Sequence, residues 1–202
     1  MKKTITTLLL ICLGIYLYIN AKNPNKKTPN NTTTIISSEI KCGDSIGSHN
    51  GIIAYYNDGF NSCGSGRHMS ADGYSYGFKW QCIEYVRRYY KDYLNHKMPN
   101  RYGNASDYFI NSLAHGVLNT ERNLIQYKNG KSEKPKEGDI LVFQNIAPPY
   151  GHVRLVTKVN GSVINVIEQN TGTSCYSTLS LSQSGQNWTI SDDCTGFLRK
   201  EE

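Results

Sequence analysis

The sequence contains no block of like charge, no internal repeat and no closely spaced pair of cysteines. The first absence argues against a tail that binds nucleic acid, and the second leaves no sign of a repeat architecture. The third, with the lack of any ligand cluster, predicts no zinc site, and we expect neither a metal nor another cofactor. The chain has 202 residues, which suits one domain with appendages and is enough to bury a core.

Tyrosine and glycine are abundant, with 15 and 18 residues respectively. This composition suits a loop-rich α+β or β-rich fold better than a helical bundle. The formal net charge of +6 suits an anionic surface such as a cell wall or a membrane, and we expect no nucleic-acid partner.

The N-terminus resembles a targeting signal. Lys2 and Lys3 precede a run of about 15 apolar residues, from Ile5 to Ile19, as in secretory signal sequences. We therefore interpret residues 1–21 as a signal peptide. The alternative is an uncleaved N-terminal anchor, although the run is short for a spanning helix of roughly 20 residues. Both interpretations predict export, to the periplasm, the cell envelope or the medium, and only an uncleaved segment would contact a membrane.

Residues 22–39 are rich in Asn, Thr, Lys and Pro, and they predict a flexible linker that cannot bury enough surface to fold. The domain itself is expected at residues 40–202, and we expect it to be a monomer. Its elements change from loops and helix to strands along the chain, which predicts an α+β layout with an antiparallel sheet. The predicted elements are a strand at 51–56, a helix at 81–94, a second short helix within 104–118, strands at 140–143 and near 196–198, and a hairpin at 152–170.

Four cysteines of the domain form an even set suited to disulfides in an oxidising compartment. They are Cys42, Cys63, Cys175 and Cys194. Of the three possible connectivities we favour Cys42 with Cys63 and Cys175 with Cys194, because each bond closes a local loop. The alternative is that the four thiols are free and buried.

Cys82 lies in the first turn of the predicted helix 81–94, where a glycine-punctuated loop ends. Unpaired N–H groups and the positive end of the helix dipole favour a thiolate there, as a nucleophile requires. The alternative is a small hydrophobic residue that packs the start of the helix. Glu84 and Arg88 lie four residues apart on the opposite, polar face, and they predict a surface ion pair.

His152 opens the first strand of the predicted hairpin and is the histidine best placed to act as a base. On the partner strand Glu168 and Asn170 are two residues apart, so both side chains point to the same face. A turn centred on residues 160–161 would put His152 opposite Gln169, between these two. A nucleophilic cysteine needs such a base and a third group that holds it. The alternative is a hairpin with ordinary polar ends.

Four segments in this order resemble the CHAP family, the cysteine, histidine-dependent amidohydrolases and peptidases. They are YGFKWQCIEYVRR, GDILVF, GHVRLVTKV and VIEQN. The closest resemblance is to the amidase domain of bifunctional glutathionylspermidine synthetase/amidases, over roughly residues 50–172. It implies an α+β, papain-like CHAP fold, in which an N-terminal helix carrying Cys82 packs on an antiparallel sheet carrying His152 and Glu168.

The resemblance also implies catalytic roles. Cys82 would be the nucleophile and His152 the general base and later acid. Glu168 would orient His152, and Asn170 would assist as a fourth polar residue.

Two further residues acquire roles from the resemblance. Gln81 would complete an oxyanion hole with the backbone N–H of Cys82. Arg87 would contact the substrate, and its alternative is a solvated charge on the face of the helix.

Together, the export signal and the resemblance predict an exported cysteine amidohydrolase or peptidase that cleaves an amide bond through a thioester acyl-enzyme. Peptidoglycan is the expected substrate, because an exported CHAP domain meets that polymer first. One alternative is an amidase of glutathionylspermidine or of a similar small conjugate. The other is a non-catalytic module that binds a cell-wall peptide.

Overall fold

The computed structural model describes residues 39–58 and 66–201, and Glu39–Glu202 form one compact unit. The predicted signal sequence, nearly all of the predicted linker and Cys63 lie outside the described residues. Within these two described ranges, no helix is long and apolar enough to cross a membrane.

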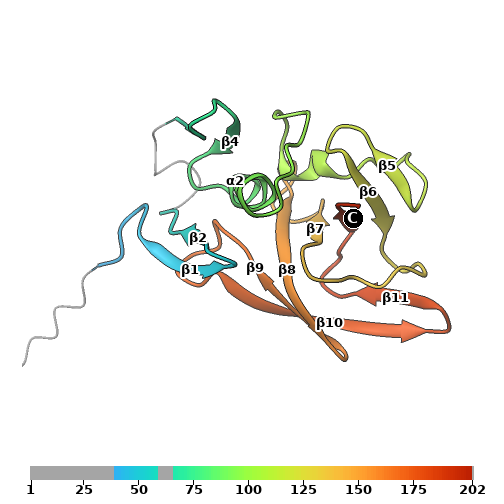
Figure 1. Cartoon of the computed structure of the whole chain (residues 1–202). Coiled ribbons are helices and arrows are strands. Elements are labelled where there is room, and N and C mark those ends of the chain that lie inside the picture. Colours follow the sequence, from blue (N-terminus) through green and yellow to red (C-terminus); the bar gives the residue numbers. More distant parts are fainter. Residues whose placement is uncertain (1–38, 59–65, 202) are drawn as a thin grey trace, which may run out of the picture. The chain divides into compact units, whose positions relative to one another are not determined.

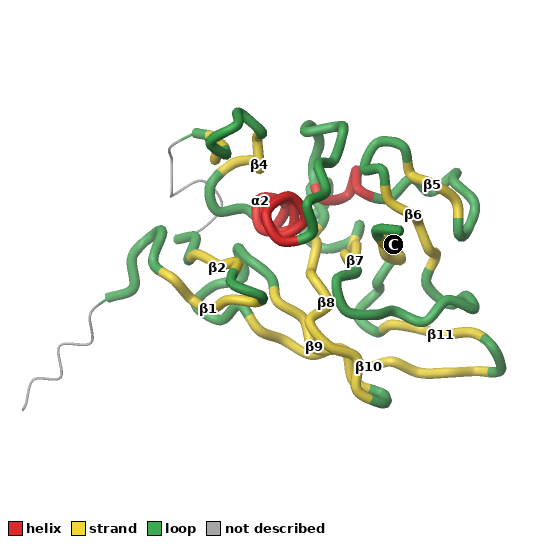
Figure 2. Tube along the Cα trace, viewed as in Figure 1, coloured by secondary structure: helices red, strands yellow, loops and turns green. Residues whose placement is uncertain are grey.

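Strands dominate the described chain and surround one short helix (Figures 1 and 2). The helix α2, Cys82–Arg88, continues as a π-helical turn at Tyr89–Tyr93, and Ala105–Tyr108 forms a 3-10 turn. The strands are β1 (Ser45–His49), β2 (Ile52–Tyr55), β3 (Arg67–Met69), β4 (Ser75–Phe78), β5 (Val117–Asn119), β6 (Leu124–Lys128), β7 (Ile140–Phe143), β8 (His152–Asn160), β9 (Val163–Ile167), β10 (Tyr176–Ser184), β11 (Asn187–Ile190) and β12 (Gly196–Arg199).

Eight strands form one antiparallel sheet in the order β11-β10-β9-β8-β7-β12-β6-β5, and the pairs β1–β2 and β3–β4 form two separate hairpins. The helix α2 packs against β8 and β4. His152 is the first residue of β8, and Glu168 directly follows β9. The predicted α+β, papain-like arrangement is therefore confirmed: the helix that carries Cys82 packs on the sheet that carries His152 and Glu168.

Strand β7 is buried on both faces of the sheet. Its residues Ile140 and Val142 belong to the apolar cluster that also contains the helix residues Tyr85 and Val86. Its residues at 141 and 143 belong to a second cluster on the opposite face. A strand buried on both faces needs an uninterrupted apolar sequence, which is what ILVF provides.

The helix covers the predicted span, but the prediction that its polar face is solvated is wrong. Glu84 is 0% exposed, Arg87 2% and Arg88 7%. The β3–β4 hairpin covers this face: His68 of β3 contacts the Glu84 carboxylate, and the backbone oxygen of Ser75 in β4 accepts a hydrogen bond from Arg87. The helical period identified the face as polar, but it carried no information about what packs against it.

The second short helix, predicted within 104–118, takes the form of the 3-10 turn Ala105–Tyr108. A capping box between Asn104 and Asp107 starts the turn, and Phe109 ends it with an extended backbone. The N–H of Ile110 then donates to Oε1 of Gln126 on β6, at 2.9 Å, instead of continuing a helix. A side chain of the sheet thus takes over the backbone that the apolar spacing assigned to a helix.

The hairpin of β8 and β9 forms as predicted, but with a shifted register. Asn160 pairs with Val163, so the turn residues are 161 and 162. Strand β8 also has a bulge between Val156 and Lys158. The β8–β9 pairing ends at Leu155 and Ile167, so Gln169 is not a paired partner of His152, which pairs with Phe143 on β7.

Of the two predicted disulfides, Cys175–Cys194 is wrong. Both thiols are free and buried, and they belong to different apolar clusters. Cys175 donates to the backbone oxygen of Ile46 at 3.2 Å, and Cys194 to that of Gly196 at 3.4 Å. Cys42 is disulfide-bonded, and its pairing with Cys63, which lies outside the described residues, stays a prediction.

Candidate active site

Cys82 is the first residue of α2 and lines a pocket of about 680 Å³. The residue before it, Gln81, has an extended backbone, and its N–H donates to the backbone oxygen of Phe78 at 3.0 Å. This turn ends β4 and starts the helix. The thiol of Cys82 therefore faces the pocket at the helix start while its residue remains only 8% exposed.

His152 reaches the same pocket from the sheet. Its neighbour Gly151 has φ +72°, and a Cβ there would lie 2.6 Å from the backbone nitrogen of Ser106. Ser106 donates its N–H to the backbone oxygen of Tyr150 at 2.8 Å, so the two segments are locked together. Only glycine permits this close approach at a positive φ, which fixes the point at which β8 begins.

Cys82 of the helix and His152 of the sheet line the same pocket, and each shifts the pKa of the other. Burial raises the pKa of the Cys82 thiol, but the charge and hydrogen bond of His152 and the N–H groups of Val153 and Ile83 outweigh it, and the net pKa is lowered. Burial would lower the pKa of His152, whereas Cys82 and Glu168 raise it to about 9. The pair therefore favours a thiolate beside an imidazolium.

Glu168 holds the other side of the imidazole. Its Oε2 lies 2.8 Å from Nε2 of His152, which leaves Nδ1 to face the thiol. The same oxygen lies 3.0 Å from Nε of Arg154, and the hydroxyl of Ser177 donates to Oε1. Burial raises the pKa of the Glu168 carboxyl, but His152, Ser177 and Arg154 together lower it below its usual range. Glu168 is thus held ionised although it is buried.

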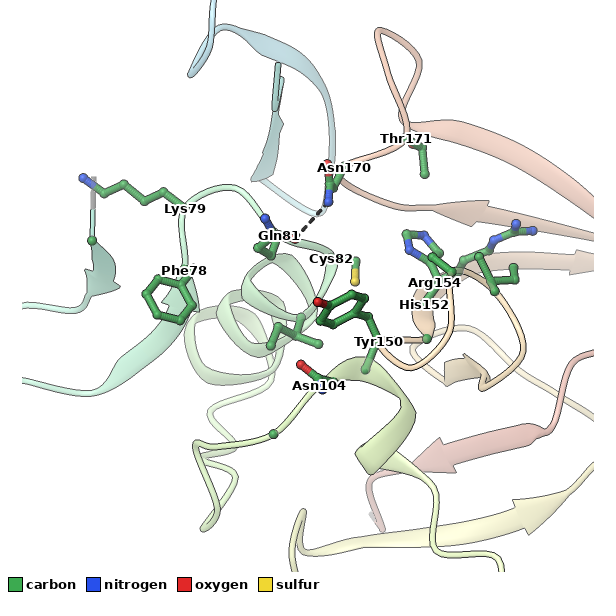
Figure 3. A pocket seen from close by; sticks show the side chains of 17 residues that line it. Phe78, Lys79, Gln81, Cys82, Asn104, Tyr150, His152, Arg154, Asn170 and Thr171 are labelled. Carbon is green, nitrogen blue, oxygen red and sulfur yellow. Dashed lines mark hydrogen bonds between the residues drawn. The ribbon is translucent and has the colours of Figure 1, made fainter. Parts of the chain in front are cut away.

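Asn170 and Gln81 lie on the opposite side of Cys82 from His152 (Figure 3). The side-chain N–H of Asn170 donates to Oε1 of Gln81 at 2.8 Å. Because this oxygen is engaged, the amide N–H₂ of Gln81 is left to donate to other groups. Asn170 itself has φ +67°, a conformation that asparagine tolerates better than most residues.

Gln169, which the sequence did not single out as a site residue, anchors this side of the pocket. It is fully buried. Its side-chain nitrogen donates to the backbone oxygen of Gln81 at 3.1 Å and to Oε2 of Glu84 at 2.8 Å. Its oxygen accepts from the N–H of Tyr55 at 2.8 Å. This amide therefore ties the helix start to the segment after β9 and to β2.

Glu84 is the centre of a buried polar network below the pocket. Nε of Arg88 donates to Oε1 of Glu84 at 2.7 Å, and Nδ1 of His68 lies 2.7 Å from the same oxygen. The expected surface pair of Glu84 and Arg88 is thus a buried one. The Glu84 carboxylate needs these partners, because a buried charge is tolerated only with a full set of them.

The structure contradicts the expectation that Arg87 contacts the substrate. Arg87 does not line the pocket; its Nε donates to the backbone oxygen of Ser75 at 3.2 Å, and its NH1 to that of Asn100 at 2.8 Å. Arg122 donates to the same oxygen of Asn100 at 3.0 Å. The two guanidinium groups hold the chain that leads to Gly103, which lines the pocket.

Two supporting residues of the site were missed from the sequence. Arg154 lies two positions after His152 on β8, so its shared face was predictable from the period of a strand. Ser177 belongs to β10, a strand that the sequence did not predict. No local pattern would have connected it with Glu168.

The comparison with protein families agrees with the cysteine and histidine in this pocket. Residues 72–170 match the CHAP domain family. This match spans 99 of the 202 residues and includes Cys82 and His152. Members of this family are cysteine, histidine-dependent amidohydrolases and peptidases, so the domain is placed among hydrolases of C–N bonds.

Curated relatives of this CHAP domain include larger proteins. The chain is 30% identical over 117 residues to the bifunctional glutathionylspermidine synthetase/amidase of Escherichia coli (strain K12), an alignment that covers 56% of the chain and 18% of that protein. It is 25% identical over 160 residues to the trypanothione synthetase of Crithidia fasciculata, covering 76% of the chain and 24% of that protein. The alignments thus span less than a quarter of either relative.

Among solved structures, the wild-type endolysin LysIME-EF1 aligns with a TM-score of 0.38 and 19% identity. This alignment covers 66% of the chain and 57% of the endolysin chain.

Proposed function

We propose that the chain is an exported cysteine amidohydrolase that cleaves an amide bond of peptidoglycan through a thioester intermediate. The observation that carries this proposal is the buried series from Cys82 through His152 to Glu168, which opens into a pocket of about 680 Å³. A packing cysteine needs neither an ionised partner nor a pocket.

In the acylation step, the thiolate of Cys82 attacks the carbonyl carbon of the amide. The developing oxyanion accepts hydrogen bonds from the backbone N–H of Cys82 and from the side-chain amide of Gln81. His152 then gives its Nδ1 proton to the leaving nitrogen as the C–N bond breaks. The products of this step are a free amine and a thioester on Cys82.

In the deacylation step, His152 is neutral and takes a proton from water. The resulting hydroxide attacks the thioester, the C–S bond breaks, and the acid leaves while the thiolate of Cys82 is restored. Glu168 keeps the imidazole oriented during both steps and stabilises its charged form. Arg154 and Ser177 serve this reaction indirectly, because they hold Glu168 ionised.

Peptidoglycan is proposed as the substrate because the N-terminal sequence is typical of an export signal. A Cys82→Ala variant should lose the ability to release fragments from purified sacculi, measured by mass spectrometry of the soluble products. Asn187→Ala, a change on exposed β11, is the matched control and should digest sacculi as the parent does. Equal digestion by the Cys82→Ala variant would refute the proposal.

A second candidate is favoured by the 30% identity to a protein named glutathionylspermidine synthetase/amidase. In that case the same chemistry would release a free polyamine from a small conjugate. Incubation of the parent with glutathionylspermidine and with sacculi in parallel separates the two candidates, because only one substrate should be consumed at a rate that depends on Cys82.

A further inference from the structure

The charged side chains that line the pocket are of one sign. Its lining side chains include Lys79 and Arg154 but no Asp or Glu. In Figure 3, Lys79 lies on one side of Cys82 and Arg154 on the other. Arg154 is already paired, with Glu168 at 3.0 Å and with Asp192 at 3.6 Å. Lys79 pairs with no carboxylate of the described residues, so the uncompensated charge lies at its end of the pocket.

A second cation, Arg67 of the β3–β4 hairpin, contacts Phe78 at that end but does not itself line the pocket. Arg67 of β3 is the cross-strand partner of Phe78 on β4, and the N–H of Lys79 donates to the backbone oxygen of Gly66 at 3.4 Å. Among the described residues, neither Arg67 nor Lys79 forms an ion pair with a carboxylate.

Exposed aromatic rings hold the guanidinium of Arg67 in place. Its Cζ lies 4.5 Å from the ring centre of Phe78 and 5.8 Å from that of Tyr102. These rings are 53% and 62% exposed, which is unusual for large apolar side chains that serve only packing. A guanidinium stacked on rings keeps its N–H edge available and matches the geometry of a carboxylate.

We propose that this end of the pocket, lined by Phe78 and Lys79 and flanked by Arg67 and Tyr102, is a subsite for a carboxylate of the substrate. The inference rests on the proposed function, because the subsite serves the nucleophile Cys82. It names the substrate class: an amide in a peptide that bears a free carboxylate near the bond to be cleaved. Conversely, a polyamine would bring ammonium groups to a pocket without acids, so cationic conjugates are disfavoured.

The expected preference is modest, because an exposed ion pair is screened by water. Such pairs change an equilibrium about two- to fivefold. Two adjacent cations should therefore favour an anionic over a matched neutral ligand by about fivefold at low salt, and the preference should shrink as the Debye length falls.

Three thiol-reactive probes of equal size test the subsite without knowledge of the natural substrate. They are the α-amides of N-iodoacetyl-glutamic acid, N-iodoacetyl-glutamine and N-iodoacetyl-lysine, which carry negative, zero and positive side chains. In each reaction the thiolate of Cys82 displaces iodide and a thioether forms. Mass spectrometry of Cys82 at mildly acidic pH gives the rate for each probe, and only the ratios within one variant are compared, so that general changes in thiol reactivity cancel.

The parent should react fastest with the glutamate probe and slowest with the lysine probe. In the Arg67→Gln/Lys79→Gln double variant the glutamate-to-glutamine ratio should fall at least threefold, and each single variant should give an intermediate ratio. Lys158→Gln removes the same charge on β8, about 20 Å along the strand from His152, and should keep the parental ratios.

Two outcomes would overturn the inference, and they are distinguishable. Unchanged ratios in the double variant would show that Arg67 and Lys79 do not select the charge, while the proposed function stands. Absence of Cys82 labelling by every probe would instead refute the reactive thiolate, and the proposed function together with its subsite would fall.

Discussion

The side chain of Asn170 donates a hydrogen bond to Oε1 of Gln81 at 2.8 Å, at the N-terminus of the helix that starts at Cys82. This contact decides which end of the Gln81 amide is free. With the oxygen occupied, the N–H₂ group is the part that remains to stabilise negative charge in the pocket. We therefore propose that Asn170 positions Gln81 as an oxyanion donor.

Gln81→Ala should lower kcat roughly 100-fold, the usual effect of losing one oxyanion donor, with a smaller change in KM. Asn170→Ala should lower kcat about tenfold, because the donor persists but loses its orientation. Steady-state kinetics on a soluble peptidoglycan fragment measures both. An Asn170→Ala loss expressed only in KM would contradict the positioning role.

The pair of Cys82 and His152 predicts the pH dependence of the reaction. His152 must be protonated to donate to the leaving amine, and its pKa is raised to about 9. As pH rises through that value the imidazolium is lost, so kcat/KM should decline with an alkaline limb near pH 9. The thiol pKa is lowered, so the acid limb should lie well below the ordinary pKa of a thiol. A profile with an alkaline limb near 6.5, the unperturbed histidine value, would contradict this assignment.

The effect of Cys82 on the pKa of His152 can be tested independently. Cys82 is the strongest influence that raises the pKa of His152, and burial opposes it. In a Cys82→Ala variant the pKa of His152 should therefore fall below that of the parent, as measured by NMR titration of the ring protons. The other histidines should keep their parental titration curves.

The central residues of the site could be predicted from the sequence, because they lie in local patterns. Cys82 lies at a loop-to-helix change, and the hairpin brought Glu168 near His152. The predicted register of this hairpin was nevertheless wrong, because the turn lies at residues 161 and 162 and β8 has a bulge between Val156 and Lys158. Glu168 still reaches His152, since a long side chain tolerates a small displacement of its backbone.

The supports of the site could not be predicted in the same way. Ser177 contacts Glu168 from β10, a strand that was not predicted, and Gln169 acts through partners that are far apart in the sequence. The error on Arg87 has the same origin. A helical period separates polar from apolar faces, but only the packing of the β3–β4 hairpin decides that the polar face is buried.

Arg154 should affect the reaction through Glu168 and not through the substrate. Its guanidinium helps to lower the pKa of the Glu168 carboxyl. In Arg154→Gln that pKa rises, so Glu168 is protonated sooner as pH falls. We expect kcat/KM to drop roughly threefold at pH 5 and to change little at pH 8. Arg154→Lys keeps the charge and should restore most of the loss at low pH, whereas an equal loss at every pH would indicate a purely structural role.

Glu84 should contribute more to stability than any surface acid of this chain. It is 0% exposed, and its carboxylate joins Arg88, His68 and the amide of Gln169. Glu84→Gln leaves Arg88 buried without its counter-charge, which typically costs about 3–5 kcal/mol.

Urea denaturation should show this loss in the free energy of unfolding. The matched control is Glu137→Gln, since that side chain is 55% exposed and its contacts with His49 and Asn50 are at the surface, so we expect a change within about 0.5 kcal/mol. Similar values for the two variants would mean that water solvates Arg88 once its partner is gone. Because Gln169 joins this network to Gln81, Glu84→Gln should also lower kcat at temperatures where the protein remains folded. A destabilised variant with parental kcat would show that the network supports the fold without positioning the site.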